Sequence, residues 1–242
     1  MRKEPYGIGS IVHAVKRGAR GFPFLKDATD KQRLLLLLAH GNDDAALSPN
    51  WFRELQDENK IGTFERASLW SERNPLVCIH CFCLHDNHYH FLLEEIVEGG
   101  IARFMQKTGT ALSSYLNEKY DESGSPFQGS YKSKTIDSDA YLRYVIAYIE
   151  VKNAFEQFPG GYAEAALNFD MAFEWAIQFP HSSLHDHLCR SDLHKSSRGI
   201  VSVNLTQSLW TSGEFKTFAR DVIEGRAHLS GLDKKAFTGT FV

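Results

Sequence analysis

The sequence contains no long apolar run. Its longest uninterrupted run, residues 34–39, is far shorter than the roughly 20 residues that a helix needs to cross a bilayer. The charges near the N-terminus are also not followed by an apolar stretch of the kind that secretory signals carry. These absences argue against a membrane-spanning helix and predict a soluble, cytoplasmic protein with no membrane partner.

Cysteine is scarce, with four residues among 242. Cys78, Cys81 and Cys83 crowd into one expected strand, and Cys189 stands alone. This layout does not suit a disulfide framework. Because free cysteine is among the most buried residue types, we expect buried thiols in a reducing compartment.

The chain also lacks a large net charge. The formal charge is −3, and 43% hydrophobic with 24% charged residues is typical of a globular protein. The distribution is uneven, because residues 1–35 hold eight lysines and arginines against three acidic residues. Such a patch can attract phosphate even in a slightly acidic protein, although a solvated charged surface is the commoner explanation.

Residue patterning predicts strands and helices in a definite order. Apolar runs bounded by turn residues indicate strands, and apolar residues at helical spacing indicate helices. The expected elements are a strand at 8–16 with a basic loop at 17–21, a helix at 29–40, a short helix near 51–55, strands at 76–84 and 88–95, a helix at 100–120, a strand at 127–136 and a helix at 140–155.

This order predicts an α+β sandwich, with a mainly antiparallel sheet and helices on one side of it. The strands at 76–84 and 88–95 form the expected hairpin. Pro159, Gly160 and Gly161 interrupt the pattern, so we place a boundary near residue 160. Beyond it we expect a helical C-terminal extension, with its best helices at 167–178 and 214–224.

His88 and His90 stand two positions apart in an expected strand. Successive side chains of a strand leave opposite faces, so the two imidazoles share one face, about 7 Å apart along the chain. Two imidazoles on one face can share a metal ion. A pair of exposed or hydrogen-bonded histidines explains the same spacing, so the pair needs a third partner to indicate a metal site.

Three tyrosines lie on the helix expected at 140–155, namely Tyr141, Tyr144 and Tyr148. Tyr144 and Tyr148 are four apart and share a helix face, a spacing that most often indicates core packing. A phenol is nevertheless a competent nucleophile toward phosphodiesters when a divalent cation polarises a non-bridging oxygen. The product of such an attack is a phosphotyrosine link rather than hydrolysed DNA.

Four segments in order resemble the single-tyrosine HUH transposases, and among them most closely the REP-associated tyrosine transposases. The segments are IVHAVKRGARG, HDNHYHFLL, FQGSYKSKTI and YLRYVIAYIEVKN. The resemblance runs from about residue 7 to residue 158, with weaker similarity beyond. It implies a ferredoxin-like sandwich, with a transposase domain at 1–158 and a helical accessory region at 159–242.

The resemblance also implies an activity. Proteins of this family cut single-stranded DNA, become joined to the 5′ phosphate through the tyrosine, and leave a 3′ hydroxyl that can reverse the step. Their two histidines correspond to His88 and His90, and their nucleophile to Tyr148. The expected cofactor is Mg²⁺ or Mn²⁺, since either ion tolerates water and phosphate oxygen. The expected partner is single-stranded DNA or a DNA hairpin, and whether the chain forms a homodimer stays open.

One position departs from the family pattern. The family commonly places asparagine or glutamine four residues after the tyrosine to complete the metal site, and this chain has Lys152 there. A charged ammonium group has no lone pair for a metal. Asn153, about 140° around a regular helix from Tyr148, is the predicted third ligand if the helix end is distorted. Glu150 and water are alternatives, and Lys152 could instead contact the scissile phosphate.

Polar and basic residues of two segments are the expected DNA contacts. The basic loop offers cations, and the strand at 127–136 mixes amide, aromatic and basic side chains suited to a nucleic-acid backbone and stacked bases. The predicted contacts are Lys16, Arg17, Arg20, Gln128, Tyr131, Lys132, Lys134 and Lys152. An edge strand protected by lysines is the competing interpretation of the second segment.

Two other functions remain compatible with the sequence. If Lys152 has abolished metal binding, the chain is a DNA-hairpin-binding module; if water replaces the tyrosine, it is a metal-dependent phosphodiesterase. A further histidine-rich segment, an apparent irregular turn, could suggest structural zinc, but its spacings match no familiar zinc pattern. We expect ordinary surface histidines in this segment, which holds His181, His185, His187, Cys189 and His194.

Overall fold

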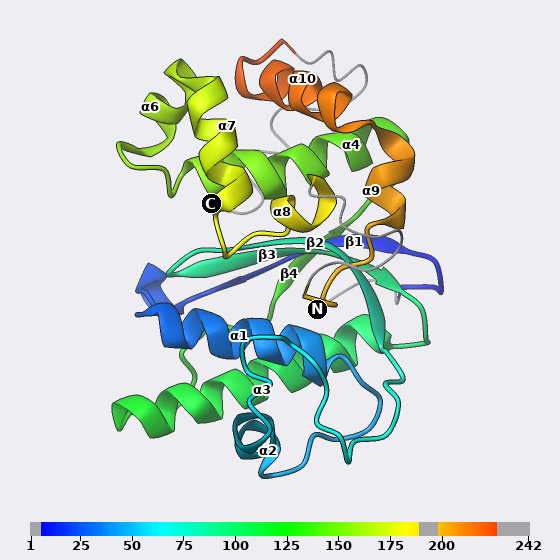
Figure 1. The fold of residues 1–242 in the computed structure, drawn as a ribbon, viewed down its shortest axis with the longest axis vertical. Coiled ribbons are helices and arrows are strands. Elements are labelled where there is room, and N and C mark those ends of the chain that lie inside the picture. Colours follow the sequence, from blue (N-terminus) through cyan, green and yellow to red (C-terminus); the bar gives the residue numbers. More distant parts are fainter. Residues whose placement is uncertain (1–5, 189–197, 227–242) are drawn as a thin grey trace.

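The computed structural model describes residues 6–188 and 198–226. Figure 1 shows three layers, with the sheet seen nearly edge-on between two groups of helices. Below the sheet lie α1 (Ala28–Gly41), α2 (Trp51–Asp57) and α3 (Gly100–Tyr120). Above it lie α4 (Asp139–Ala147) and the helices that follow α4 in the chain.

The sheet has four strands in the order β2-β3-β1-β4, and every neighbouring pair is antiparallel. The strands are β1 (Ile11–Arg17), β2 (Val77–Leu84), β3 (His88–Glu95) and β4 (Lys132–Thr135). Since α1 connects β1 to β2 and α3 connects β3 to β4, the chain follows the order that defines a ferredoxin-like sandwich. The predicted fold class is confirmed.

The lower layer begins with a well-capped helix. The Asp27 side chain accepts a hydrogen bond from the Asp30 amide at 2.9 Å, and the Asp30 carboxylate accepts one from the Asp27 amide at 3.3 Å. This capping box satisfies amides that the first turn of α1 leaves unpaired. The leucines of α1 then pack with apolar residues of α3 and of the sheet to form the lower core.

The sequence suggested helices on one side of the sheet. In the structure, helices cover both faces. In β3, Tyr89, Phe91 and Leu93 belong to the lower core, whereas Leu92 belongs to an upper core shared with α4. A strand that is apolar on both faces must be covered on both. The two longest expected helices therefore lie on opposite sides, with α3 below and α4 above.

Two expected elements are shortened or broken. The strand expected at 127–136 is reduced to β4, because Gly129 has a φ of +135°, a conformation that favours glycine and interrupts the ladder. The helix expected at 140–155 consists of α4, a π-helical turn η2 (Tyr148–Lys152) and α5 (Asn153–Phe155). Ser138 caps it, with its side chain accepting from the Tyr141 amide at 3.3 Å.

The C-terminal helices extend the upper core. Phe169, Phe173 and Phe215 share one apolar cluster with Val145 and Ile149. Residues on both sides of position 158 thus pack together, and a division into two domains there stays a prediction. A short helix replaces the irregular turn expected at 181–188, and the elements of this region are α6 (Gly161–Leu167), α7 (Phe169–Gln178), α8 (Leu184–Leu188), α9 (Asn204–Leu209) and α10 (Ser212–Ile223).

Across residues 6–188 and 198–226, no helix combines the length and the apolar character that a bilayer span requires.

Candidate active site

His88 and His90 project from the upper face of the sheet. Because Tyr89 and Phe91 pack in the lower core, the alternation of β3 sends both histidines to the face covered by α4. His90 is buried, and its ring centroid lies 5.0 Å from that of His88. The two rings share one face, as their spacing predicts.

Each of these rings is oriented through its Nδ1 atom. His88 Nδ1 lies 2.6 Å from Asn87 Oδ1, which only accepts, so Nδ1 carries the proton and Nε2 keeps its lone pair. His90 Nδ1 lies 2.9 Å from Nε2 of His13 on β1. When His13 accepts this hydrogen bond, His90 Nε2 also keeps a lone pair. Partners of this kind fix the tautomer of metal-binding histidines.

Burial keeps these imidazoles neutral. It lowers the pKa of His88 to about 3, with smaller contributions from His85 and Arg17. It lowers the pKa of His13 to about 3 and that of His90 well below the usual value. Since a neutral imidazole is the form that binds a metal ion, these donors fit a divalent cation.

A third histidine and a glutamate stand next to His88. His85, at the hairpin turn, stacks on His88 with centroids 4.0 Å apart and ring planes 17° apart. Its Nδ1 lies 3.9 Å from Oε2 of Glu156, the residue that follows α5. One donor atom from each of these three residues lies within 4.8 Å of the other two. They form a compact set of possible ligands that the sequence did not single out.

Tyr148 begins the π turn and lies against the histidines. Its ring centroid is 5.6 Å from that of His90 and 6.0 Å from that of His13, with the rings edge to face. Tyr144 instead stacks on Tyr148 at 6.1 Å, and the Tyr141 ring receives a lysine ammonium group. Burial raises the pKa of Tyr148 to about 12, with Glu156 adding to the shift and Arg17 opposing it.

The π turn supplies the helix distortion that Asn153 needs. The Asn153 amide donates to the Tyr148 carbonyl, five residues back, instead of closing the four-residue step of an α-helix. Asn153 is buried, and its Nδ2 has no hydrogen-bond acceptor among the described residues. Lys152 pairs with Glu156, and its ammonium group lies 5.0 Å from the centroid of the Tyr148 ring.

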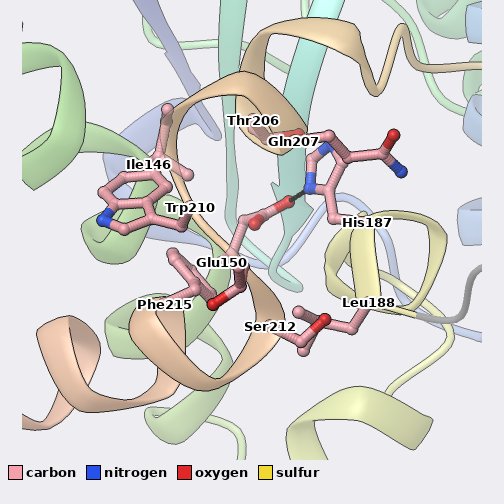
Figure 2. Close-up of a pocket in the computed structure, with 10 residues that line it drawn as sticks. Ile146, Glu150, His187, Leu188, Thr206, Gln207, Trp210, Ser212 and Phe215 are labelled. Carbon is pink, nitrogen blue, oxygen red and sulfur yellow. Dashed lines mark ion pairs between the residues drawn. The ribbon is translucent and has the colours of Figure 1, made fainter.

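Glu150, the alternative ligand, is buried in a separate cluster. Ser183 Oγ donates to Glu150 Oε1 at 2.6 Å, and His187 forms an ion pair with the same oxygen. Figure 2 shows this pair in a pocket that Trp210 and Phe215 also line. The pocket has a volume of about 20 Å³, which suits roughly one water molecule. Glu150 therefore connects the middle of the π turn to α8.

Part of the predicted DNA-contact set surrounds this site. Arg17 on β1 is paired with His88 on the neighbouring strand β3. Lys132 and Lys134 on β4 are paired with β1 residues whose side chains lie on the upper face. Arg17, Gln128 and Lys132 line a cavity of about 50 Å³. Within the described part of the chain, the buried Arg17 Nε has no hydrogen-bond acceptor. A phosphate oxygen would provide one.

The remaining predicted contacts lie elsewhere. Lys16 and Tyr131 line a hollow of about 520 Å³ beside α3, on the lower side of the sheet. Arg20 is exposed in the loop that follows β1. Strand alternation explains the separation, because Lys16 and Arg17 are neighbours on β1 and must point to opposite faces.

The second histidine-rich segment does not form a zinc site in the part that the structure describes. His187 pairs with Glu150, and His181 packs edge-on against Phe179 at 5.3 Å. Cys189 and His194 lie outside the described residues. Of the cysteines expected to be buried, Cys81 and Cys83 are, and Cys78 is half-buried.

Sequence reasoning missed His13, His85 and Glu156. His13 occupies a same-face position in a recognised strand, but only the register of β1 against β3 shows that it meets His90. His85 is a turn residue next to the histidine pair, which was the available signal. Glu156 gave no signal, because its approach depends on the π turn that precedes it.

Part of this chain is similar to a known family of proteins. Residues 63–152 match the family described as transposase IS200 like, and this segment contains both histidines and Tyr148 and ends at Lys152. A solved structure of a REP-associated tyrosine transposase bound to a REP hairpin is similar over 78% of this chain and 85% of that chain, with 11% sequence identity and a TM-score of 0.44. Among curated proteins, none matches this chain.

Proposed function

We propose, on the premise that residues 63–152 carry the confirmed likeness to IS200-like transposases, that this chain cuts single-stranded DNA and holds the new 5′ phosphate on Tyr148. The observation that carries the proposal is the position of the Tyr148 ring, 5.6 Å from His90 on the face that also bears His88. A phenol beside two oriented, neutral imidazoles has the parts that phosphoryl transfer by a tyrosine needs.

In the proposed reaction, the phenol oxygen of Tyr148 attacks the phosphorus of a phosphodiester. A bond forms between phosphorus and the phenol oxygen, the bond between phosphorus and the 3′ oxygen breaks, the phenol loses a proton and the 3′ oxygen gains one. Attack by another 3′ hydroxyl reverses these changes and joins the strands, so the cycle needs no external energy source. The reaction therefore supports strand transfer as well as cleavage.

The phenol needs help, since its pKa of about 12 keeps it protonated at neutral pH. Mg²⁺ or Mn²⁺ bound by His88 and His90 would polarise a non-bridging phosphate oxygen and offset the developing charge. The chain's own contribution is position. Asn87 and His13 hold the two rings, the π turn holds Tyr148, and the buried Asn153 is the third ligand predicted from the sequence.

The proposed DNA path runs around the β4 edge of the sheet. On the upper face, Arg17, Gln128 and Lys132 would hold the scissile phosphate, with Lys134 and Lys152 nearby. On the lower side, the hollow lined by Lys16 and Tyr131 would receive the stem of a hairpin. Both hollows include Ser130, so one nucleic acid can reach both. The exposed Arg20 would add a phosphate contact.

The test uses the full chain and labelled single-stranded DNA that carries hairpins from beside its own gene. We expect a Mn²⁺-dependent band in which DNA migrates with protein on a denaturing gel, lost with chelator and with Tyr148→Phe. Tyr144→Phe is the matched control, because it removes the neighbouring stacked phenol and should leave the band.

Two results would support the competing functions. Tight hairpin binding without any covalent band would indicate a DNA-binding module, an alternative that the pairing of Lys152 with Glu156 keeps open. Metal-dependent cleavage that survives Tyr148→Phe would indicate a phosphodiesterase that uses water. Either result would contradict the tyrosine mechanism.

A further inference from the structure

The proposed site has two histidines and needs a third metal ligand. Lys152 occupies the position where the resemblance leads us to expect an amide, and its charged ammonium group cannot bind a cation. A third donor must therefore come from elsewhere. The structure offers a carboxylate in the right place, which is the donor that Mg²⁺ and Mn²⁺ prefer.

The carboxylate is that of Glu156. One of its oxygens lies within 4.8 Å of donor atoms of both His85 and His88. The same carboxylate acts on the nucleophile, since it contributes to the raised pKa of Tyr148. Glu156 is thus within reach of His85 and His88, and its charge also acts on Tyr148.

The π turn brings Glu156 to this position. The five-residue hydrogen bond from Asn153 to Tyr148 delays the helix by one residue, and Glu156 then follows α5 directly. Its amide still bonds to the Lys152 carbonyl at 3.3 Å, which fixes the backbone beside the site. The glutamate is therefore held by helical structure rather than by a loose tail.

His85 is held as firmly. Its amide donates to the His88 carbonyl at 2.8 Å and closes the hairpin, and its ring is buried against the His88 ring. The Gln157 side-chain amide, from the same helix end as Glu156, lies 3.0 Å from His85 Nδ1. With its oxygen turned to accept from Nδ1, His85 Nε2 keeps a lone pair for the ion. The hairpin turn and the helix end thus converge on one point.

We propose that His85 and Glu156 complete the ion site with His88, so that Glu156 takes the part that an amide has in the related proteins. The inference rests on the proposed function and names the ligands of the same site. Lys152 then neutralises Glu156 when no ion is bound. Ion binding releases its ammonium group, which lies 5.0 Å from the Tyr148 ring centroid, toward the phosphate.

The experiment measures Mn²⁺ binding to the full chain in the absence of DNA, from the loss of the free Mn²⁺ signal in electron paramagnetic resonance. Glu156→Leu and His85→Phe should each weaken binding by at least about tenfold, since even indirect partners of a metal site commonly contribute that much. His88→Ala should weaken it further. Asn153→Ala removes the ligand predicted from the sequence and should weaken binding less than Glu156→Leu does. Lys152→Met should raise the affinity, because the competing cation is removed.

The matched control is Glu94→Leu, which changes another half-buried glutamate that pairs with a histidine on the same sheet face. It should bind Mn²⁺ like the unaltered chain, and thermal unfolding of each variant identifies any loss of fold. If Glu156→Leu keeps full affinity while His88→Ala loses it, the inference is wrong and the proposed metal site stands. If Asn153→Ala alone loses affinity, Asn153 is the ligand and Glu156 is not.

Discussion

Two groups of three potential ligands lie on the upper face of the β2–β3 hairpin, and their surroundings differ. One group is His85, His88 and Glu156 at the turn, and the other is Cys78, His80 and Glu94 at the opposite end. In the second group, all donors come from the hairpin, and His80 Nε2 lies 2.9 Å from Glu94 Oε2. In the first, the carboxylate comes from the helix segment that carries Tyr148.

The group of Cys78, His80 and Glu94, called the remote group below, arises from a β-bulge. The register shifts between Ile79 and Cys81, so His80 is an extra residue on β2 and lies beside Cys78, with Sγ and Nδ1 3.9 Å apart. The group of His85, His88 and Glu156 at the turn is surrounded, in addition, by oriented histidine rings, a phenol and cationic side chains. The difference shows that a cluster of donors becomes a candidate active site only when a second element brings a nucleophile to it.

The largest expected effect separates the two groups directly. His88→Ala should reduce the Mn²⁺-dependent DNA adduct to background, because it removes a ligand next to Tyr148. His80→Asn should leave the rate of adduct formation within about twofold, since His80 stands at the other end of the hairpin. Adduct formation on labelled hairpin DNA measures both. Equal losses would remove the distinction between the two groups.

The second effect concerns the buried ion pair of His187 with Glu150, which anchors the π turn to α8. His187→Ala leaves the Glu150 carboxylate buried without its cation, and breaking such a pair costs about 3–5 kcal/mol of unfolding free energy. Urea denaturation measures the loss. Lys216→Ala, which breaks exposed ion pairs with Asp170 and Glu174, is the control and should cost about 1 kcal/mol or less.

This anchor should also respond to pH. Burial alone lowers the pKa of His187, but Glu150 more than offsets this and the pKa is raised. The stabilisation by the pair is therefore complete below pH 6.5, the ordinary histidine value, and is lost as the pH rises through the raised pKa. A stability difference between the unaltered chain and His187→Ala that grew at alkaline pH would contradict the ion pair.

The third effect is on the orientation of the His90 ring by His13. In the remote group, the His80 ring pairs instead with Glu94. His13→Phe keeps the packing but removes the partner of His90 Nδ1. The affinity for Mn²⁺ should fall by about 10-fold to 100-fold, as is usual when such a partner is lost. Titration calorimetry measures the affinity. An unchanged value would show that His90 orientation does not depend on β1.

The last effect is a change in acid sensitivity. Burial lowers the pKa of His85 to about 4, so between pH 6.5 and 4 the unfolded chain binds a proton that the folded chain does not. Metal-free stability should thus fall as the pH drops through this range, by about 1.4 kcal/mol per pH unit for this residue. His85→Phe should remove that part of the slope in urea denaturation, whereas Glu94→Gln should keep it.

The sequence predicted what local periodicity determines. The bounds of β3 and α3 match the expected ranges, and the two histidines share a face because strands alternate. The helices α1 and α4 begin one residue before their expected starts at 29 and 140, and the order of the elements fixed the ferredoxin-like sandwich. The bounds of β4 were overextended, since one glycine conformation ended the ladder early.

The rest of the site depends on long-range register and on helix irregularity. His13 lies against His90 through the pairing of β1 with β3, which joins residues 77 positions apart. The division of the predicted basic residues between two faces follows from strand alternation, and it could have been anticipated for Lys16 and Arg17. Glu156 could not have been, since regular helix geometry gives it the wrong phase relative to Tyr148.

The π turn has a consequence for how this chain is aligned with others. Structurally, it acts as a one-residue insertion that leaves no gap in the sequence, since the helix continues on both sides of it. A residue at a given number of positions after Tyr148, beyond the π turn, therefore lies on a different side of the helix from the side it would occupy in a regular helix. Removing one residue between 149 and 152 would replace the π turn by a regular α-helical turn and leave everything after it, Glu156 included, on the side of the helix that it occupies now.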